Sequence, residues 1–424
     1  MTGSGYGGVR WVLAAWVLTR AALLLFVTKA VVFPGPDVTS DVSVIYRGWY
    51  EVLRTGTFPW DDVAWQYPPA AALALLSPGV LPFLDYAAAF FVIALLCDAA
   101  VLALLLSAGR HPGRSARGSW VWVVGVPLLG PTAYARYDLM VTAVAVAALL
   151  AGIRRPGAFG ALAAFGALLK VWPALLLAAA PKRTWWSAAV TAAALAGAFL
   201  LAAPGAFAFL TYQRDRGTEV ESLGALVFHL ARLTGGWDGQ VLLNYGSVEF
   251  LGPYVSLVST AALLLALGAL AWLVVWRARA RLTDAGPSTT ADAALTAVLL
   301  FTTTSRVISP QYLVWLVGLA AVCLLHRDSR MALPCWLVVA ASAVTVLEFP
   351  VFFARVVASD PLGVLLLVVR NGLLVAATVT ACRRLWRATV PGTAGRPADA
   401  SPLPARQEVP VSPSAGGGSR ASAP

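Results

Sequence analysis

Residues 86–107 read YAAAFFVIALLCDAAVLALLLS, an apolar run long enough to cross a lipid bilayer as one helix. Runs of this kind recur along almost the whole chain, so we predict an all-α polytopic membrane protein with about twelve transmembrane helices. The predicted spans, several of them short, are Trp11–Phe33, Tyr86–Ser107, Trp120–Ala133, Leu139–Ile153, Phe159–Leu169, Trp172–Ala180, Trp186–Ala203, Phe250–Trp276, Ala293–Thr304, Tyr312–Leu325, Met331–Leu347 and Leu362–Cys382. A further apolar stretch, Pro69–Leu84, is interrupted by Ser77-Pro78-Gly79 and is interpreted as a re-entrant or interfacial segment.

The composition excludes several classes of soluble protein. Of the 424 residues, 59% are hydrophobic and only 12% are charged, and the mean hydropathy is +0.76. Soluble domains carry roughly 25% charged residues, so this chain is not a cytosolic enzyme, a secreted disulfide scaffold or a disordered regulator. The net charge of +11 would suggest nucleic acid in a soluble protein. Here we attribute it to membrane topology and predict no nucleic-acid partner.

The arginines and lysines predict the orientation in the membrane. Most of the 31 basic residues fall in loops on one side of the predicted bilayer, which the positive-inside rule makes cytoplasmic. We therefore predict a multi-pass plasma-membrane protein with both termini in the cytoplasm. The long loops Pro34–Pro68 and Pro204–Glu249 then lie outside, together with most acidic residues, and we expect the active site there.

The chain is predicted to form one membrane domain and a tail. Residues 1–390 hold the spans, and residues 391–424 are rich in Pro, Ala, Ser and Gly, which predicts a disordered cytoplasmic tail.

The four cysteines and three histidines have no metal-ligand spacing, so no metal site is predicted. No internal repeat at a fixed period is evident, which disfavours an inverted-repeat transporter.

The first outer loop combines a capping signal with an apolar helical face. Residues 37–53 read DVTSDVSVIYRGWYEVL, and Asp41 would lie at the N-terminus of a helix, where the helix dipole favours a carboxylate. Val42, Ile45 and Trp49 are spaced to face the membrane, and Tyr46 is an interface residue. Asp41 is therefore either a carboxylate aimed at a lipid-borne substrate or the capping residue of an ordinary interfacial helix.

The same loop ends in a second acidic and aromatic segment, which runs from Asp61-Asp62 to Gln66-Tyr67-Pro68-Pro69. The two prolines end the loop stiffly and open the next helix. Asp61 and Asp62 could hold a substrate hydroxyl or a metal, or they could form a solvated turn.

Charged residues also lie at the membrane ends of short spans. Arg136 and Asp138 flank Tyr137 in an outer turn, and Lys170 precedes Trp172-Pro173 between two half-length apolar runs. A charge near membrane depth is costly and tends to face a polar cavity or a partner. Arg136 and Lys170 are therefore candidate cations for a phosphate. The alternatives are snorkelling of Lys170 and a structural ion pair of Arg136 with Asp138.

Two later segments are polar at the outer boundary. Residues 212–222 alternate in charge and include Arg214, Arg216 and Glu221, which suits a phosphate or sugar site or a solvated surface. Residues 305–312, SRVISPQY, break a helix where irregular backbone is tolerated if it lines a cavity.

These segments resemble a known family. The run from Asp41 through Tyr46 to Gln66-Tyr67-Pro68-Pro69 resembles the first outer loop of GT-C glycosyltransferases, and more narrowly of glycosyltransferase family 87. That family includes actinobacterial mannosyltransferases that use polyprenyl-phosphate mannose to extend phosphatidylinositol mannosides. Further similar segments follow in family order: Arg136-Tyr137-Asp138-Leu139, Lys170-Val171-Trp172-Pro173, Asp215 to Ser222, and Ser309-Pro310-Gln311-Tyr312.

The resemblance implies a GT-C fold with amphipathic helices in the first outer loop, and it implies the chemistry. A hexose, expected to be mannose, would move from a polyprenyl-phosphate sugar to a lipid-linked or envelope glycan acceptor, without a metal or other cofactor. Asp41 matches the catalytic aspartate and would be the general base of an inverting displacement. The candidate phosphate-binding residues are Arg136, Lys170, Arg214 and Arg216. The candidate substrate-binding residues are Tyr46, Asp62, Gln66, Tyr67, Asp138, Glu221, Gln311 and Tyr312. The main alternative is a transporter or flippase of a lipid-linked glycan.

Overall fold

Long apolar helices form the membrane-spanning part of the protein. The structure, a computed structural model, describes residues 4–212, 217–282 and 286–392. Within these residues six helices are long and apolar enough to cross a bilayer, as a polytopic all-α membrane protein requires. They are α1 (Ser4–Val27), α4 (Tyr86–Gly109), α8 (Lys182–Ala202), α11 (Val255–Arg279), α14 (Ala332–Val346), which continues into η5 (Leu347–Val351), and α16 (Pro361–Thr389). The predicted tail lies outside the described residues from residue 393 onward.

The other predicted spans coincide with shorter helical segments. These are α5 (Arg117–Gly125) with η3 (Pro127–Ala133), α6 (Asp138–Gly152), α7 (Pro156–Leu169), η4 (Trp172–Ala179), α12 (Thr289–Thr304) and α13 (Tyr312–Leu325). From Leu313 onward, α13 is buried along its whole length, so protein rather than lipid surrounds it. The short segments therefore form the interior of the bundle, and the long helices enclose them.

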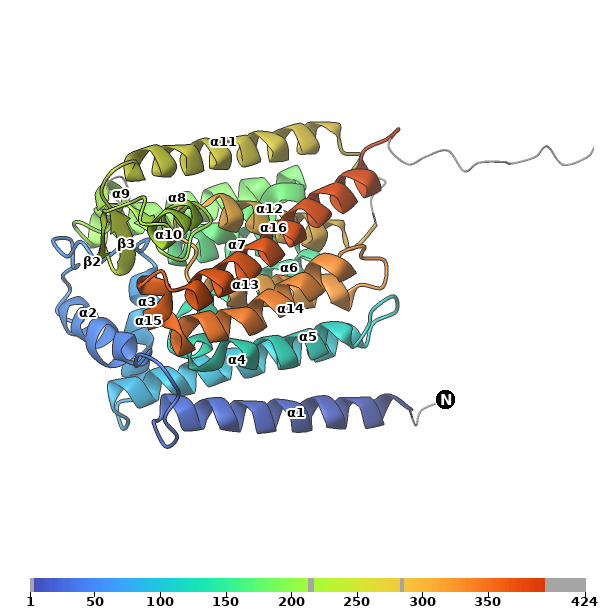
Figure 1. The fold of residues 1–424 in the computed structure, drawn as a ribbon. Helices are drawn as coiled ribbons and strands as arrows, with labels where there is room; N and C mark the ends of the chain where they lie inside the picture. Colours follow the sequence, from blue (N-terminus) through green and yellow to red (C-terminus); the bar gives the residue numbers. More distant parts are fainter. Residues whose placement is uncertain (1–3, 213–216, 283–285, 393–424) are drawn as a thin grey trace, which may run out of the picture.

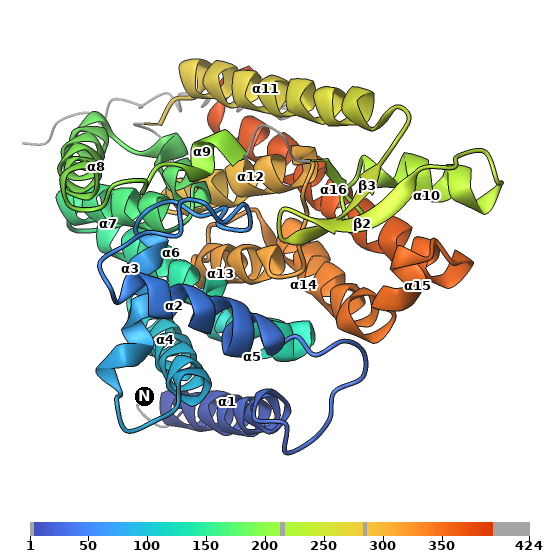
Figure 2. The same ribbon diagram turned by 90° about the vertical axis from the view of Figure 1, so that its left-hand side faces the viewer.

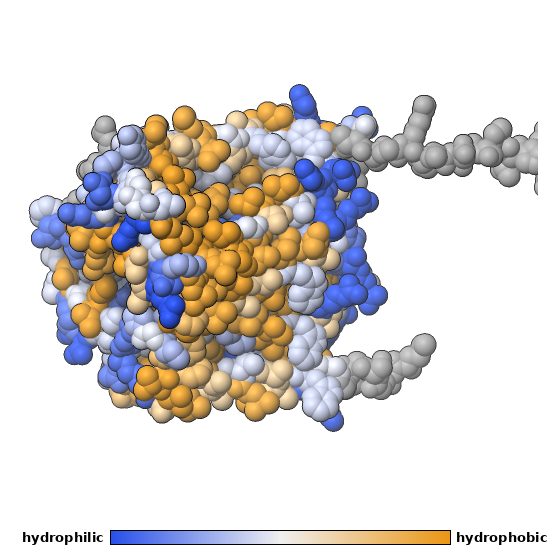
Figure 3. Space-filling view, viewed as in Figure 1, coloured by the Kyte–Doolittle hydropathy of each residue, from blue (hydrophilic) through white to orange (hydrophobic). Residues whose placement is uncertain are grey.

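Basic side chains gather at one end of the bundle, which we call the basic end. It is defined by Arg110, Arg114, Arg117, Arg154, Arg155, Lys182, Arg183, Arg277, Arg279, Arg281, Arg327, Arg330, Arg383, Arg384 and Arg387. In Figure 1, α1 begins and α16 ends there, and Figure 3 shows a broad hydrophobic surface over α14 and α16 between two hydrophilic ends. Separate loops meet at this end, where Arg281 N donates to Thr389 O at 2.9 Å and Arg327 N donates to Gly113 O at 3.1 Å.

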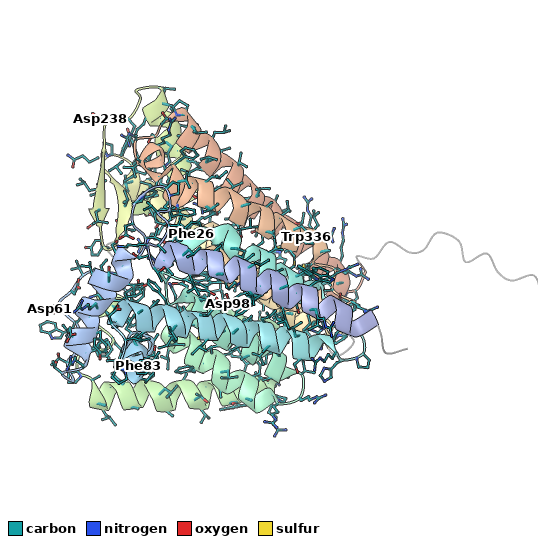
Figure 4. The ribbon with its side chains drawn as sticks, turned by 90° about the horizontal axis from the view of Figure 1, so that it is seen from below. Phe26, Asp61, Phe83, Asp98, Asp238 and Trp336 are labelled. Carbon is teal, nitrogen blue, oxygen red and sulfur yellow. The ribbon has the colours of Figure 1, made fainter. Side chains whose placement is uncertain are left out.

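The opposite end, which we call the loop end, carries short helices and a small sheet (Figure 2). Asp61 and Asp238 lie at this end, and Asp98 lies within the bundle (Figure 4). The helical elements are η1 (Asp41–Tyr46), α2 (Arg47–Leu53), α3 (Ala71–Leu76), η2 (Ser77–Val80), α9 (Phe209–Tyr212), α10 (Ala225–Leu233) and α15 (Phe353–Val357). The strands β1 (Thr218–Glu219), β2 (Gln240–Asn244) and β3 (Ser247–Leu251) form an antiparallel sheet in the order β1-β3-β2.

Two predicted segments are clarified by the structure. The span predicted to begin at Phe250 begins instead at Val255, because Phe250 belongs to β3 and packs its ring against Phe228 and Trp237 at the loop end. The apolar stretch Pro69–Leu84 forms only α3 and η2, both too short to span a bilayer. Its first turn is tied to α7, since Ala70 N donates to Leu168 O at 2.9 Å.

Candidate functional site

A cavity of about 360 Å³ opens at the loop end, and we call it the loop-end cavity. Five parts of the chain build it: the first outer loop, the junction of α7 and η4, the start of α9, the turn between β2 and β3, and the segment from the end of α12 into α13. Its lining includes seven residues that the sequence singled out, namely Asp41, Tyr46, Gln66, Tyr67, Lys170, Gln311 and Tyr312. Segments far apart in the sequence, from Asp41 to Trp315, therefore meet around one space.

Asp41 begins η1, a π-helical turn of a kind that is often found at functional sites. Its Oδ2 atom lies 2.8 Å from Arg136 Nη2, and 31% of its side chain stays exposed. Arg136 is buried behind it and also donates from Nη1 to Val38 O at 3.1 Å and to Ala135 O at 2.9 Å. Arg136 does not line the cavity. Its guanidinium therefore orients the Asp41 carboxylate and ties the first outer loop to the turn before α6.

Lys170 is held by one carboxylate and four aromatic rings. Its Nζ donates to Asp138 Oδ1 at 2.6 Å and lies 5.1–5.6 Å from the ring centroids of Tyr67, Tyr137, Tyr312 and Trp315. Trp315 Nε1 donates to the same Asp138 oxygen at 2.7 Å. Cation–π contacts favour an ammonium at this distance, so the positive charge is fixed at the cavity wall. Asp138 lies behind Lys170 and does not line the cavity.

The local backbone explains why Lys170 reaches the cavity. α7 ends at Leu169, and Lys170 is extended, with φ −159° and ψ 133°. Pro173 follows near the start of η4, where its missing N–H costs no helical hydrogen bond. The extended residue between the two helical segments turns the lysine side chain out of either helix axis.

Two tyrosines of the first outer loop line the cavity, and one of them contributes a neutral donor. Tyr46 is buried and stacks on Trp49 at a centroid distance of 5.9 Å. Burial raises the pKa of Tyr67 to about 12, and the charge of Asp138 adds to this effect. Tyr67 therefore stays protonated at neutral pH and can donate a hydrogen bond to a sugar hydroxyl or a phosphate oxygen.

The segment between α12 and α13 supplies a cation that the sequence did not single out as a site residue. Arg306 lines the loop-end cavity and also a second cavity of about 780 Å³, which we call the α11 cavity. The α11 cavity lies against one side of α11 and shares Leu210, Phe301, Ser305 and Arg306 with the loop-end cavity. Arg306 was visible in the sequence as part of the helix break at residues 305–312, but nothing there pointed to two adjoining cavities.

Other predicted residues lie elsewhere. Asp62 accepts hydrogen bonds from Trp49 Nε1 at 2.7 Å and Ala64 N at 2.8 Å, so it braces the first outer loop. Glu221 is buried in a separate cluster, where Arg370 of α16 lies between Glu221 and Glu348 at 3.8 and 3.2 Å. Neither carboxylate lines the loop-end cavity. Arg214 and Arg216 lie outside the described residues.

Comparison with known proteins identifies a family. The model of glycosyltransferase family 87 matches residues 65–310, which is more than half of the chain. The matched part includes Gln66, Tyr67 and Lys170 of the cavity and stops just before Gln311, whereas Asp41 precedes it. No curated protein and no solved structure matches the chain. On the strength of that match and of its apolar helices, this chain belongs to glycosyltransferase family 87 and is a membrane glycosyltransferase.

Proposed function

We propose that this protein transfers a hexose, expected to be mannose, from a polyprenyl-phosphate sugar to a lipid-linked or envelope glycan acceptor. The observation that carries the proposal is that a candidate base and a candidate phosphate-binding cation line one cavity. The oriented carboxylate of Asp41 and the fixed ammonium of Lys170 line the same space, which adjoins a second cavity beside α11. A base and a cation are the groups that displacement of a phosphate leaving group needs.

The reaction is an inverting displacement. Asp41 accepts the proton of an acceptor hydroxyl. The oxygen of that hydroxyl attacks the anomeric carbon of the donor sugar, and the bond from that carbon to the phosphate oxygen breaks. The sugar develops oxocarbenium character, and polyprenyl phosphate leaves with the bonding electron pair. Lys170 and Arg306 offset the negative charge of the leaving phosphate. Arg136 positions Asp41, and the Tyr67 hydroxyl binds sugar. No cofactor takes part.

The geometry of the two cavities supports a lipid-borne donor. Residues from Val255 to Ala266 of α11 line the α11 cavity, and most of them are apolar or small. Arg306 lies where this cavity adjoins the loop-end cavity. A polyprenyl chain along α11 would carry its phosphate to Arg306 and its sugar toward Asp41.

We also propose the orientation in the plasma membrane. The positive-inside rule assigns the basic end to the cytoplasm, so both termini are cytoplasmic, and the loop-end cavity faces outside. The twelve predicted spans then run alternately between the two sides, with the short ones inside the bundle. Polyprenyl-phosphate sugars are donors that suit an outer site, because nucleotide sugars stay in the cytoplasm.

The test compares Asp41→Asn with wild type in nanodiscs that contain radiolabelled polyprenyl-phosphate mannose and a lipid extract of the source cells. We expect wild type to form a labelled glycolipid and Asp41→Asn to form none while still binding the donor. Asp61→Asn is the matched control, because Asp61 is an exposed carboxylate of the same loop that does not line the cavity. Equal transfer by wild type and Asp41→Asn would remove Asp41 from the mechanism. Donor movement across the bilayer without transfer, unaffected by Asp41→Asn, would indicate a flippase instead.

A further inference from the structure

The turn between β2 and β3 has an unusual residue at its tip. Asn244 pairs with Ser247, and the two residues between them, Tyr245 and Gly246, have φ values of +47° and +77°. A two-residue hairpin turn with positive φ at both central positions favours Asn-Gly, because most L side chains are strained there. Glycine adopts such a φ readily at position 246, whereas the tyrosine at position 245 destabilises the turn.

Other residues hold this turn in place. Buried Glu249 of β3 accepts hydrogen bonds from Ser247 Oγ at 2.9 Å, Gly217 N at 2.9 Å and Asn244 Nδ2 at 3.2 Å. The tip reaches the first outer loop, since a Cβ atom added to Gly246 would lie 3.9 Å from Ala64 O. The hairpin is therefore braced on both sides without help from the Tyr245 side chain.

Tyr245 lines the loop-end cavity together with Asp41 and Lys170. Most aromatic residues of the first outer loop pack on one another, as Trp49, Trp65 and Tyr67 do at centroid distances of 5.2–5.8 Å. Among the described residues, the Tyr245 ring has no aromatic neighbour of this kind, and its side chain has no hydrogen-bond partner. A half-buried aromatic ring at a cavity wall, without a partner in the fold, is available to a ligand.

We propose that Tyr245 is the stacking platform for the acceptor, whose pyranose ring lies with its apolar face on the tyrosine ring. The inference rests on the proposed function and deepens it by assigning the acceptor side of the cavity. The turn lines the loop-end cavity but not the α11 cavity, which we assign to the lipid chain of the donor, so the turn is separate from that chain. A sugar on Tyr245 would therefore share the cavity of Asp41 without entering the α11 cavity.

The experiment uses Tyr245→Asn, which removes the ring and places a residue favoured by this turn. Tyr245→Phe keeps the ring without the hydroxyl. The matched control is Tyr254→Asn, because Tyr254 is also a tyrosine with positive φ. Tyr254 directly precedes α11, is 71% exposed and lines neither cavity. Thermal unfolding in nanodiscs establishes that all variants are folded, and we expect Tyr245→Asn to be at least as stable as wild type.

Initial rates are measured with polyprenyl-phosphate mannose as donor and octyl α-D-mannopyranoside as acceptor probe. We expect Tyr245→Asn to raise the KM for the acceptor at least tenfold and to leave the KM for the donor within twofold. Tyr245→Phe and Tyr254→Asn should stay close to wild type. An acceptor KM within twofold of wild type in Tyr245→Asn, or a rise confined to the donor KM, would overturn the proposal.

A binding measurement separates this inference from the transferase reaction itself. Saturation-transfer NMR with methyl α-D-mannopyranoside and methyl α-D-glucopyranoside reports which sugar protons contact the protein. We expect contact through one face of the ring in wild type and in Asp41→Asn, and its loss in Tyr245→Asn. If transfer is absent but this pattern holds, the platform stands and the proposed reaction fails. If Tyr245→Asn keeps the contact, or wild type shows none, the platform is wrong whatever the transfer assay gives.

Discussion

Asp98 of α4 lies inside the bundle, where its carboxylate is surrounded by donors. Arg20 of α1 reaches it with Nε at 2.7 Å and Nη2 at 3.2 Å. Trp16, Trp122 and Tyr134 donate to the same carboxylate at 2.7–3.0 Å. A buried charge is tolerated when it is paired and hydrogen-bonded in this way. Because most other side chains of α1 are exposed, this network is the main polar link between α1 and the bundle.

We expect Asp98→Leu to lower the free energy of unfolding by about 3–5 kcal/mol, because it leaves Arg20 buried without a counter-charge. The double variant Arg20→Met with Asp98→Leu should be closer to wild type, since neither charge remains. Thermal unfolding in detergent, carried through the full double-mutant cycle, measures both effects. A double variant whose loss equals the sum of the two single losses would contradict this account of the pair.

At the level of single residues, the sequence indicated which charged side chains belong to the site, but it did not indicate which of them form ion pairs with one another. Lys170 stood out because its flanks are apolar, and Asp41 stood out because of its capping position and family resemblance. The nearest partner for Arg136 in the sequence is Asp138, two residues away. In the structure Arg136 pairs with Asp41, and Asp138 pairs with Lys170. The packing of η1 and of the α7–η4 junction against this turn decides the pairing, and neither contact has a local signal.

Among the elements, the small sheet controls the wall of the loop-end cavity. Glu219 of β1 accepts hydrogen bonds from Ile308 N at 2.6 Å and Ser309 Oγ at 2.8 Å. Glu219 N in turn donates to Arg306 O at 3.1 Å. β1 therefore holds the segment between α12 and α13, which lines the cavity, in one conformation. Glu219 is a positioning residue rather than a ligand of the substrate, since it does not line the cavity itself.

We expect Glu219→Gln to loosen this segment, because the amide N–H₂ group would face Ile308 N or Ser309 Oγ, which are donors. The lost hydrogen bond to a charged group is worth about 1.5–3 kcal/mol. Hydrogen exchange of a peptide that covers residues 305–311 should become roughly ten- to a hundredfold faster. Glu51→Gln is the control, because Glu51 is exposed and pairs with nearby Arg54 at 3.1 Å. Unchanged exchange in Glu219→Gln would show that the segment is held by other contacts.

The sheet also marks where prediction of elements failed. The helices follow directly from apolar runs, and α4, α6 and α13 begin within one residue of their predicted starts. The strands are five residues or fewer, and β3 precedes α11 so closely that its apolar residues were counted with the span. The hairpin signal was present in Asn244-Tyr245-Gly246-Ser247, but Tyr at the first turn position obscures the usual Asn-Gly pattern.

For the whole molecule, the separation of charge between the two ends predicts which end faces the cytoplasm. The native cysteines are half-buried or buried in helices, which makes a labelling experiment feasible. Thr55 is exposed at the loop end, and Pro112 is exposed at the basic end. We expect an impermeant maleimide to label Thr55→Cys in right-side-out vesicles and Pro112→Cys only in inside-out vesicles. The reverse pattern would place the cavity in the cytoplasm and remove the reason for a polyprenyl-phosphate donor.

The position of α11 predicts a side of the molecule that opens to lipid. α11 lies at the edge of the bundle next to α12 (Figures 1 and 2), and few of its side chains are buried. The α11 cavity runs along the face of α11 that carries Ser259, Ala262 and Ala266. A groove beside a peripheral helix can admit a lipid chain laterally from the bilayer, whereas a cavity enclosed by the inner helices could not.

We therefore expect Ala262→Trp to fill the α11 cavity and to raise the KM for a long-chain polyprenyl-phosphate sugar at least tenfold. Ala261→Trp is the matched control, because Ala261 is the adjacent alanine of the same helix, is exposed and does not line the cavity. A donor with a single short prenyl chain should be less affected by Ala262→Trp, since less of it occupies the groove. Equal losses in the two variants, or a loss independent of chain length, would mean that the donor chain lies elsewhere and that α11 serves only to enclose the bundle.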